Sequence, residues 1–171
     1  MILALLFFWS ILSYLTISRF VLGGTEVVGN SMAPTLEDGE RLLIDRLTYR
    51  LRAPSPGEIV AIQLPDDTEM AVKRIIAGPD DSVQARDDRV WVNGRPLEES
   101  YLDGPVRTDS GRLSTNVYVV DQDCYFVLGD NRQNSLDSRF FGAVQQNQIM
   151  GRVIRPSFTS DRPAFTLTSS R

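Results

Sequence analysis

The chain has 171 residues, of which 42% are hydrophobic, and a formal net charge of −4 at pH 7. This length and composition allow one domain of ordinary size with a real core, and the acidic balance argues against nucleic acid as a partner. The chain has no histidine, and Lys73 is the single lysine among 18 basic residues. The absence of histidine excludes a Ser-His-Asp hydrolase. Arginine stays protonated and cannot act as a base, so the base of any serine hydrolase here is Lys73 or a carboxylate.

Metal chemistry finds little support in the sequence. The chain has neither a cluster of cysteines nor any histidine, so we expect no zinc site. The single cysteine, Cys124, excludes an internal disulfide, and its apolar neighbours favour a buried role. We therefore expect neither a metal nor another cofactor.

Residues 1–18 contain no charged side chain and are mostly Leu, Ile and Phe. A helix needs about 20 apolar residues to span a bilayer, so this segment lies at the short end of the range. We predict a retained transmembrane anchor that ends at Arg19, whose long side chain can reach the lipid interface. The alternative is a cleaved signal peptide, although the basic stretch that normally precedes its apolar core is missing. The flanking charge specifies orientation poorly, and the natural start could lie upstream of Met1.

Beyond the anchor we expect a juxtamembrane segment over residues 19–30, a β-rich domain over 31–156 and a tail over 157–171. Asn93-Gly94 is typical of a two-residue β-hairpin turn, and the polar residues 95–116 predict a long loop. Short apolar or alternating runs between turns predict strands at Arg41–Ile44, Glu58–Leu64, Glu69–Ile76, Val90–Val92, Val117–Val120, Tyr125–Leu128 and Ile149–Ile154. The sequence thus predicts a mainly β fold, a partly open barrel or sandwich of short strands, with one N-terminal transmembrane helix.

The first group of residues with chemical potential surrounds Ser31, which follows Gly29-Asn30 and precedes a proline-containing turn. In such a turn the hydroxyl and the backbone amide of Ser31 can both face a cleft. A serine that satisfies local backbone groups is the commoner outcome beside Gly and Pro, and the local sequence leaves this alternative open.

Lys73 lies in the second group, within the strand-like run Glu69–Ile76. Alternate residues of a strand share a face, so Lys73 is expected to point the same way as Ala71 and Ile75. An amine on an apolar face loses solvation, which lowers its pKa and lets it accept a proton. The alternative is an edge lysine whose side chain extends into solvent.

The third group, Gly129–Arg139, follows an apolar strand and is unusually rich in Asn, Asp and Arg. Asp137 and Arg139 are spaced to form an ion pair that braces the loop, and Ser135 is placed to hydrogen-bond an amine and aim its lone pair. A solvated loop is the alternative.

Together these motifs, in this order, resemble the type I signal peptidases, which are membrane-anchored serine endopeptidases with a Ser-Lys dyad. The resemblance runs from Arg19 to Val153 and rests on four motifs that fit the family in sequence and distance. They are Ser-Met-x-Pro-Thr-Leu at Ser31–Leu36, Pro-Gly-Glu-Ile-Val at Pro56–Val60, Val-Lys-Arg at Val72–Arg74 and Gly-Asp-Asn-Arg-x-x-Ser-x-Asp-Ser-Arg at Gly129–Arg139.

The resemblance implies that Ser31 is the nucleophile, Lys73 the general base and Ser135 the residue that orients Lys73. It assigns supporting roles to Asp130, Asn131, Asp137 and Arg139. Backbone amides at Ser31 and Gly29 would form the oxyanion hole. The pocket for small substrate side chains is our own inference from the flanking residues, which are Val28, Met32 and Val72.

The implied reaction is removal of signal peptides from secreted preproteins after small residues at the −1 and −3 positions. The implied location is a cell membrane, or a thylakoid-type inner membrane, with the catalytic domain on the extracytoplasmic side. Preproteins and the lipid bilayer are the expected partners, and the sequence leaves the oligomeric state open. A self-cleaving Ser-Lys protease of the repressor kind is disfavoured, because the chain has an apolar N-terminus and no DNA-binding segment.

Two departures from the family pattern favour an alternative. Many members carry serine where this chain has Gly29, and the family's Gly-x-Pro-Gly-Asp turn reads Ala77-Gly78-Pro79-Asp80-Asp81 here. Asp80 can replace glycine, because Asp tolerates the left-handed backbone better than most residues. The alternative function is a catalytically impaired, membrane-anchored relative that acts as a binding protein.

Overall fold

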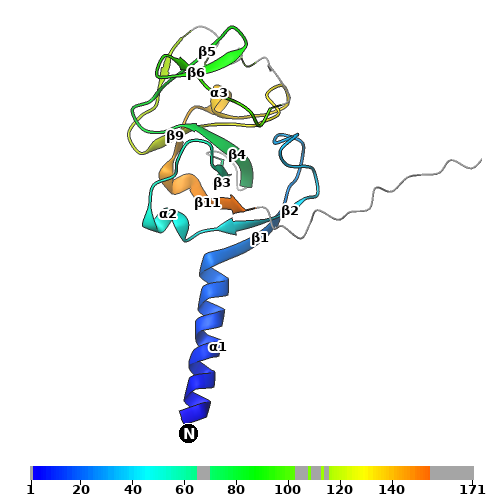
Figure 1. Ribbon diagram of the computed structural model, residues 1–171, viewed down its shortest axis with the longest axis vertical. Helices are drawn as coiled ribbons and strands as arrows, with labels where there is room; N and C mark the ends of the chain where they lie inside the picture. Colours follow the sequence, from blue (N-terminus) through cyan, green and yellow to red (C-terminus); the bar gives the residue numbers. More distant parts are fainter. Residues whose placement is uncertain (1, 65–69, 103–107, 109–112, 114–115, 155–171) are drawn as a thin grey trace, which may run out of the picture.

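The computed structural model describes residues 2–64, 70–102, 108, 113 and 116–154 (Figure 1). Its helical elements are α1 (Ile2–Val21), α2 (Thr48–Leu51), α3 (Ser138–Phe141) and the 3₁₀ turn η2 (Gln146–Gln148). Its strands are β1 (Leu22–Glu26), β2 (Arg41–Asp45), β3 (Ile59–Gln63), β4 (Met70–Ala77), β5 (Ser82–Arg86), β6 (Arg89–Val92), β7 (Arg95–Pro96), β8 (Tyr118–Val119), β9 (Cys124–Leu128), β10 (Val144–Gln145) and β11 (Ile149–Ile154).

The strands form two antiparallel sheets, as the prediction of a mainly β fold requires. The larger, curled sheet has the order β1-β2-β11-β3-β4-β9-β10, and the smaller has the order β7-β6-β5-β8. Every run predicted as a strand contains one, although the bounds differ by a few residues. Strands β1, β5, β7 and β10 were not predicted, because they are short and hold few adjacent apolar residues.

Left-handed backbone occurs at the turns that the sequence singled out. Asn93 and Gly94 have φ of 52° and 73° and join β6 to β7, with Val92 paired to Arg95. This confirms the predicted hairpin and shortens the predicted loop, since its first residues form β7. Asp80 has φ of 65°, which confirms that it adopts the backbone expected of the family's glycine.

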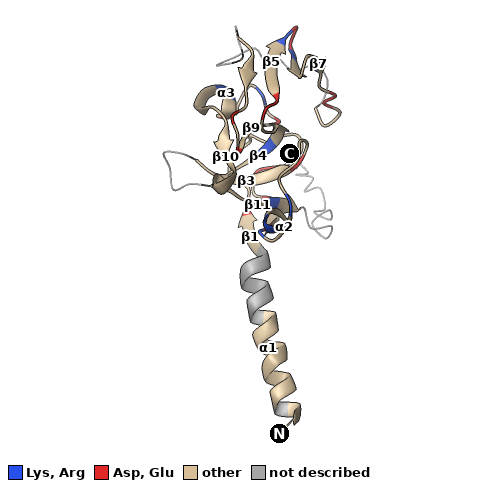
Figure 2. Ribbon diagram, turned by 90° about the vertical axis from the view of Figure 1, so that its left-hand side faces the viewer, with Lys and Arg blue, Asp and Glu red and all other residues tan. Residues whose placement is uncertain are grey.

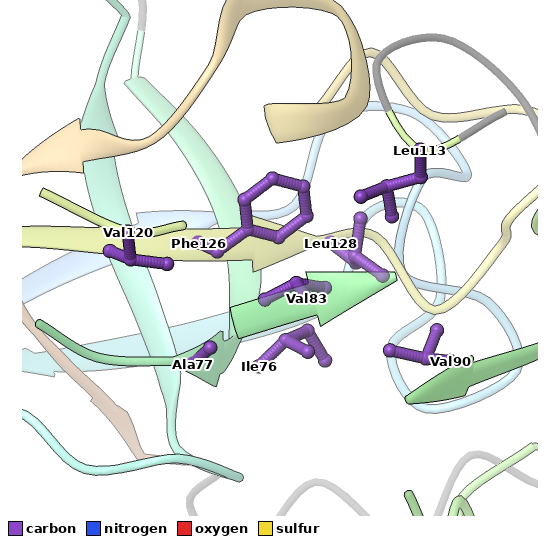
Figure 3. Packing of buried hydrophobic residues seen from close by; sticks show 8 residues of the cluster. All are labelled: Ile76, Ala77, Val83, Val90, Leu113, Val120, Phe126 and Leu128. Atoms are coloured by element: carbon purple, nitrogen blue, oxygen red, sulfur yellow. The ribbon is translucent and has the colours of Figure 1, made fainter. Parts of the chain in front are cut away.

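Three apolar clusters form the core. The first lies between the two sheets, where Ile76 and Phe126 of the large sheet meet Val83 and Val90 of the small one (Figure 3). The second cluster includes Val60, Ile75 and Val127, and the third packs Val27, Met32, Leu36 and Leu42. Ile75 and Ile76 belong to different clusters, as alternation along a strand predicts. Strand β4 therefore has apolar packing on both faces.

Helix α1 projects away from the two sheets, with β1 at its end (Figures 1 and 2). Each large apolar side chain described between Ile2 and Tyr14 is at least 41% exposed. Over the residues that the structure describes, none of the helices combines the length and apolar character needed to cross a membrane. The predicted transmembrane helix over residues 1–18 is therefore not confirmed, and the predicted tail over 157–171 lies outside the described residues.

Replacing Gly151 with alanine should lower the free energy of unfolding by about 1–3 kcal/mol, because the new methyl group overpacks the contact between β11 and β2. An ideal Cβ at Gly151 would lie 2.5 Å from Asp45 O and 2.7 Å from Ile44 Cγ2. Urea denaturation of the full chain, followed by circular dichroism, measures the change.

The matched control is Gly24→Ala in β1, whose Cβ would meet nothing within 4 Å. It should change the free energy of unfolding by less than about 0.5 kcal/mol. Equal stability of the two variants would contradict the account of β11 packing.

Candidate active site

Ser31 lies in the loop between β1 and β2, and buried side chains hold this loop in place. Met32 and Leu36 are 1% and 2% exposed, and they pack against Val27 and Leu42 in the third core cluster. Because the residue next to Ser31 is fixed in the core, the position of the serine backbone is fixed as well.

Lys73 lies on β4, which pairs with β3 on one side and β9 on the other. Its side chain is only 4% exposed. The Lys73 Nζ atom lies 2.9 Å from Ser31 Oγ, which is hydrogen-bonding distance. The structure thus joins the two side chains that the sequence singled out as nucleophile and base.

Burial lowers the pKa of the Lys73 amine, because loss of water penalises its charged form. The Asp137 carboxylate raises this pKa, Arg139 lowers it and Asp130 raises it, but burial is the largest influence. The net lowering increases the fraction of neutral amine near neutral pH. A neutral lysine beside a serine hydroxyl can take its proton.

The loop that begins at Gly129 contacts the Ser31 loop directly. Asn131 N donates to Ser31 O at 3.0 Å, and Asn131 Nδ2 donates to Asn30 O at 3.1 Å. A Cβ on Gly129 would lie 2.5 Å from Ser31 O and 2.2 Å from Ser135 Oγ. Only glycine therefore permits the close approach of the two loops, and Asn131 links them by hydrogen bonds while its supporting role stays a prediction.

Ser135 lies near this contact but makes no hydrogen bond to Lys73. Within the described part of the chain, its Oγ is the one buried side-chain polar atom that lacks a hydrogen-bond partner. An unsatisfied buried hydroxyl is unusual and needs an explanation. The role of Ser135 in orienting Lys73 stays a prediction.

The predicted ion pair between Asp137 and Arg139 is confirmed. Arg139 Nε lies 2.8 Å from Asp137 Oδ1, and Arg139 Nη2 lies 2.9 Å from Asp137 Oδ2. Both side chains are buried, and Arg139 Nη2 also donates to Arg132 O at 2.7 Å. Asp137 Oδ2 accepts from Gly129 N at 3.0 Å. The pair therefore links both ends of the loop.

A second buried ion pair, between Arg74 and Asp130, was not predicted. Arg74 Nε and Nη2 donate to the two carboxylate oxygens of Asp130 at 2.9 and 2.6 Å. Thr35 donates its hydroxyl to the same carboxylate, and Tyr101 stacks on the Arg74 guanidinium with its ring centre 3.9 Å away. The sequence indicated only that Arg74 points to the face of the strand opposite Lys73, because neighbouring residues of a strand alternate. It did not indicate which carboxylate Arg74 would meet there.

The two candidate oxyanion donors, the amides of Gly29 and Ser31, differ in whether they already donate a hydrogen bond. Gly29 N donates to Asp38 Oδ1 at 2.7 Å, so this amide is engaged within the loop. Gly29 has φ of 86°, a backbone conformation that side-chain-bearing residues rarely adopt. Ser31 N donates to no residue in the described ranges. The geometry therefore favours the Ser31 amide over that of Gly29 for holding an oxyanion.

The three residues predicted to line a substrate pocket occupy different environments. Val28 is 92% exposed, whereas Met32 is 1% exposed and belongs to the core. Val72 is partly buried and packs against the same cluster. Met32 packs with Val27, Leu36 and Leu42, and its role in a substrate pocket stays a prediction, as do those of Val28 and Val72.

The described residues contain no group of three or more Cys, Asp or Glu side chains that could hold a metal ion. A pocket of about 730 Å³ lies away from Ser31 and Lys73, between α2 and η2. Its walls include Arg46, Arg50 and Asp123.

Comparison with known proteins adds independent evidence. The family model described as "Signal peptidase, peptidase S26" matches residues 1–158. A probable signal peptidase I-2 from Synechocystis sp. is 38% identical over 143 residues, which cover 80% of this chain and 63% of that relative. The chain thus spans less than two thirds of that relative's length.

Two further relatives are covered more fully. A signal peptidase I from Leptolyngbya laminosa is 36% identical over 153 residues, covering 85% of this chain and 73% of that protein. Signal peptidase IB from Staphylococcus aureus is 32% identical over 150 residues, covering 80% of this chain and 78% of that protein. A solved signal peptidase I from Enterococcus faecalis is 34% identical, with a TM-score of 0.49 over 59% of this chain and 97% of that one.

The family model covers most of the chain, and two of these relatives exceed 30% identity with more than two thirds of their length covered. The chain therefore belongs to the signal peptidase family, peptidase S26.

Proposed function

We propose that this chain is a serine endopeptidase that removes signal peptides from secreted preproteins with Ser31 as nucleophile and Lys73 as general base. The observation that carries the proposal is the 2.9 Å separation of Lys73 Nζ and Ser31 Oγ in a buried site. Membership of the signal peptidase family supports the choice of substrate.

Acylation needs a neutral Lys73 amine. This amine takes the Ser31 proton as Oγ attacks the carbonyl carbon of the scissile bond. The carbonyl oxygen becomes an oxyanion, and the Ser31 amide, which donates to none of the described residues, would stabilise it. Lys73 then gives its proton to the leaving nitrogen, which departs as the new N-terminus of the mature protein.

In deacylation Lys73 is again the base, with water as the nucleophile and Ser31 Oγ as the leaving group. Lys73, neutral again, takes a proton from water as the water oxygen attacks the ester carbonyl of the acyl-enzyme. The proton returns to Ser31 Oγ as the ester bond breaks, and the signal peptide leaves with a new carboxylate. Each proton that Lys73 accepts is therefore returned within the same half-reaction.

Substrate contacts follow from the exposed surface beside the dyad. Val28 and Val72 are the apolar residues proposed to contact the small side chains at the −1 and −3 positions.

We further propose that the exposed apolar side chains of α1 enter a bilayer as a single-pass anchor. This arrangement would place the catalytic domain on the extracytoplasmic side of a cell membrane, where membrane-bound preproteins can reach it.

The engaged Gly29 amide favours a second candidate function, a catalytically impaired relative that binds preproteins. Loss of one oxyanion donor costs about 10²–10³ in rate in other hydrolases. The two candidates differ in whether the product forms at all, which the first experiment decides.

Ser31→Ala and Lys73→Met should each reduce cleavage of an Ala-x-Ala preprotein by roughly 10⁴-fold or more, since members of a catalytic dyad act as a unit. The full chain in detergent micelles is mixed with the preprotein, and the product N-terminus is sequenced. Thermal unfolding of both variants checks that the fold is intact. Cleavage at the wild-type rate by either folded variant would contradict the dyad, and no cleavage by wild type would favour the binding protein.

The rate of cleavage should fall on acidification, because protonated Lys73 has no lone pair to accept the Ser31 proton. Since burial lowers the pKa of Lys73 from its ordinary value of 10.5, the rate should rise with pH and level off below that value. The measurement is kcat/KM against pH with a peptide that does not itself titrate. A rate that stays constant through the whole acidic range would contradict Lys73 as the base.

Ser135→Ala should lower kcat by about 10²-fold through loss of positioning, with KM nearly unchanged. It should also move the pH at which the rate levels off, because Ser135 would act on Lys73 itself. Stability should change little, since Ser135 Oγ has no hydrogen bond to lose. The control is Ser100→Ala at an exposed position, and an unchanged kcat and pH profile in Ser135→Ala would exclude the positioning role.

A further inference from the structure

Helix α2 and the residue pair before it present two short rows of side chains. Arg46 and Arg50 are exposed, and so are Leu47 and Leu51, which are 40% and 78% exposed. Arg46 and Leu47 directly precede the helix, and Arg50 and Leu51 lie within its single turn. The segment from Arg46 to Leu51, called the α2 surface below, therefore exposes two arginines, its cationic row, and two leucines, its apolar row.

The two arginines of the α2 surface have no acidic partner among the described residues, whereas nearby arginines do. Arg52 and Arg152 both pair with Glu58. The closest acidic residue in sequence, Asp45, accepts hydrogen bonds from Leu47 N at 2.9 Å and from Thr48. Asp45 is thus engaged within its own turn, which leaves Asp123 as the one carboxylate that lines the pocket with Arg46 and Arg50.

The α2 surface lies at the end of the domain where α1 ends and β1 begins. An ideal Cβ on Gly23 would be 3.3 Å from Arg46 Nη2, so this guanidinium lies against the second residue after α1. Figures 1 and 2 show α2 near β1, at the α1 end of the large sheet. Arg46 is therefore close to where the exposed apolar helix leaves the domain.

The same arginines border the pocket of about 730 Å³ between α2 and η2. Its opposite wall includes Gln145, Gln146 and Asn147, whose amides can donate hydrogen bonds. Asp123 is the one carboxylate in the wall, so two arginines against one aspartate leave an excess of one positive charge. This open, polar and cationic pocket has the chemistry of an anion site.

We propose that the α2 surface docks on the anionic phospholipid headgroups of the bilayer that α1 enters. This inference rests on the proposed membrane location and goes beyond it by naming the second contact and its lipid class. Arg46 and Arg50 bind headgroup phosphates at the mouth of the pocket, and Leu47 and Leu51 enter the acyl boundary beside them. A soluble phosphate ligand would leave the exposed leucines unexplained, whereas a lipid surface accounts for both rows.

The first test is partition of the full chain onto vesicles of phosphatidylcholine, with or without phosphatidylglycerol. Phosphatidylglycerol should raise the partition coefficient of the wild-type chain, and this increase should be smaller by on the order of 30-fold in Arg46→Gln/Arg50→Gln. The reason is that each basic residue near an anionic surface contributes to binding. Binding to pure phosphatidylcholine should be unchanged. Because partition needs no turnover, its outcome is separate from that of the Ser31–Lys73 chemistry.

The matched control is Arg89→Gln/Arg95→Gln, which removes the same charge from exposed positions on β6 and β7. Figure 1 places β6 at the end of the molecule opposite α1. The control should alter the gain by less than about twofold, because charges beyond a Debye length are screened. An equal loss in both double variants, or none in Arg46→Gln/Arg50→Gln, would overturn the proposal.

A second measurement tests the apolar row. Leu47→Ser/Leu51→Ser should weaken binding to both kinds of vesicle by about tenfold or more, since burial of a leucine side chain in lipid is lost twice. Thermal unfolding of the variant checks that it is folded, because Leu47 is only 40% exposed and partly covered by the domain. Unchanged binding of this folded variant would show that α2 does not enter the lipid and would overturn the proposed geometry.

Discussion

Burial of the Lys73 amine beside Ser31 is the constraint on which the rest of the site depends. An isolated charged amine is costly to bury, so the site favours the neutral form that can accept a proton. Strand β4 provides this burial because it lies between β3 and β9 and has apolar clusters on both faces. The sheet therefore prepares the base, and the Ser31 loop, fixed by Met32 in the core, brings the nucleophile to it.

Burial affects the pKa of Lys73 more than the neighbouring charges do, so the net change is a lowering. Two carboxylates act to raise its pKa, those of Asp137 and Asp130. Each of them is held by its own arginine, Asp137 by Arg139 and Asp130 by Arg74. A carboxylate whose charge is matched by a guanidinium holds a neighbouring ammonium ion less strongly. The two buried ion pairs thus brace the loops and also limit the stabilisation of protonated Lys73.

The sequence predicted those parts of the site that are local or carried by motifs. Asp137 and Arg139 are two residues apart, so their pairing could be proposed from spacing alone, while Ser31 and Lys73 were found through ordered motifs. The Arg74–Asp130 pair joins residues 56 positions apart, and only the register of β4 with β9 brings them together. Burial of Met32 and the hydrogen bond from Gly29 to Asp38 likewise depend on how the loop folds back. Strand β1 was missed because its two glycines carry no strand signal.

The β1–β2 pair links the two proposed membrane contacts to the nucleophile. In its register Leu22 is opposite Asp45 and Glu26 is opposite Arg41, so α1 and the α2 surface lie at one end and the Ser31 loop at the other. Five residue pairs at about 3.4 Å per residue make this hairpin roughly 17 Å long. If α1 and α2 both contact lipid, the length and tilt of the hairpin set the height of Ser31 above the bilayer. A second contact at α2 would limit that tilt, which a single helix leaves free, and would hold the nucleophile at a constant distance from membrane-bound substrates.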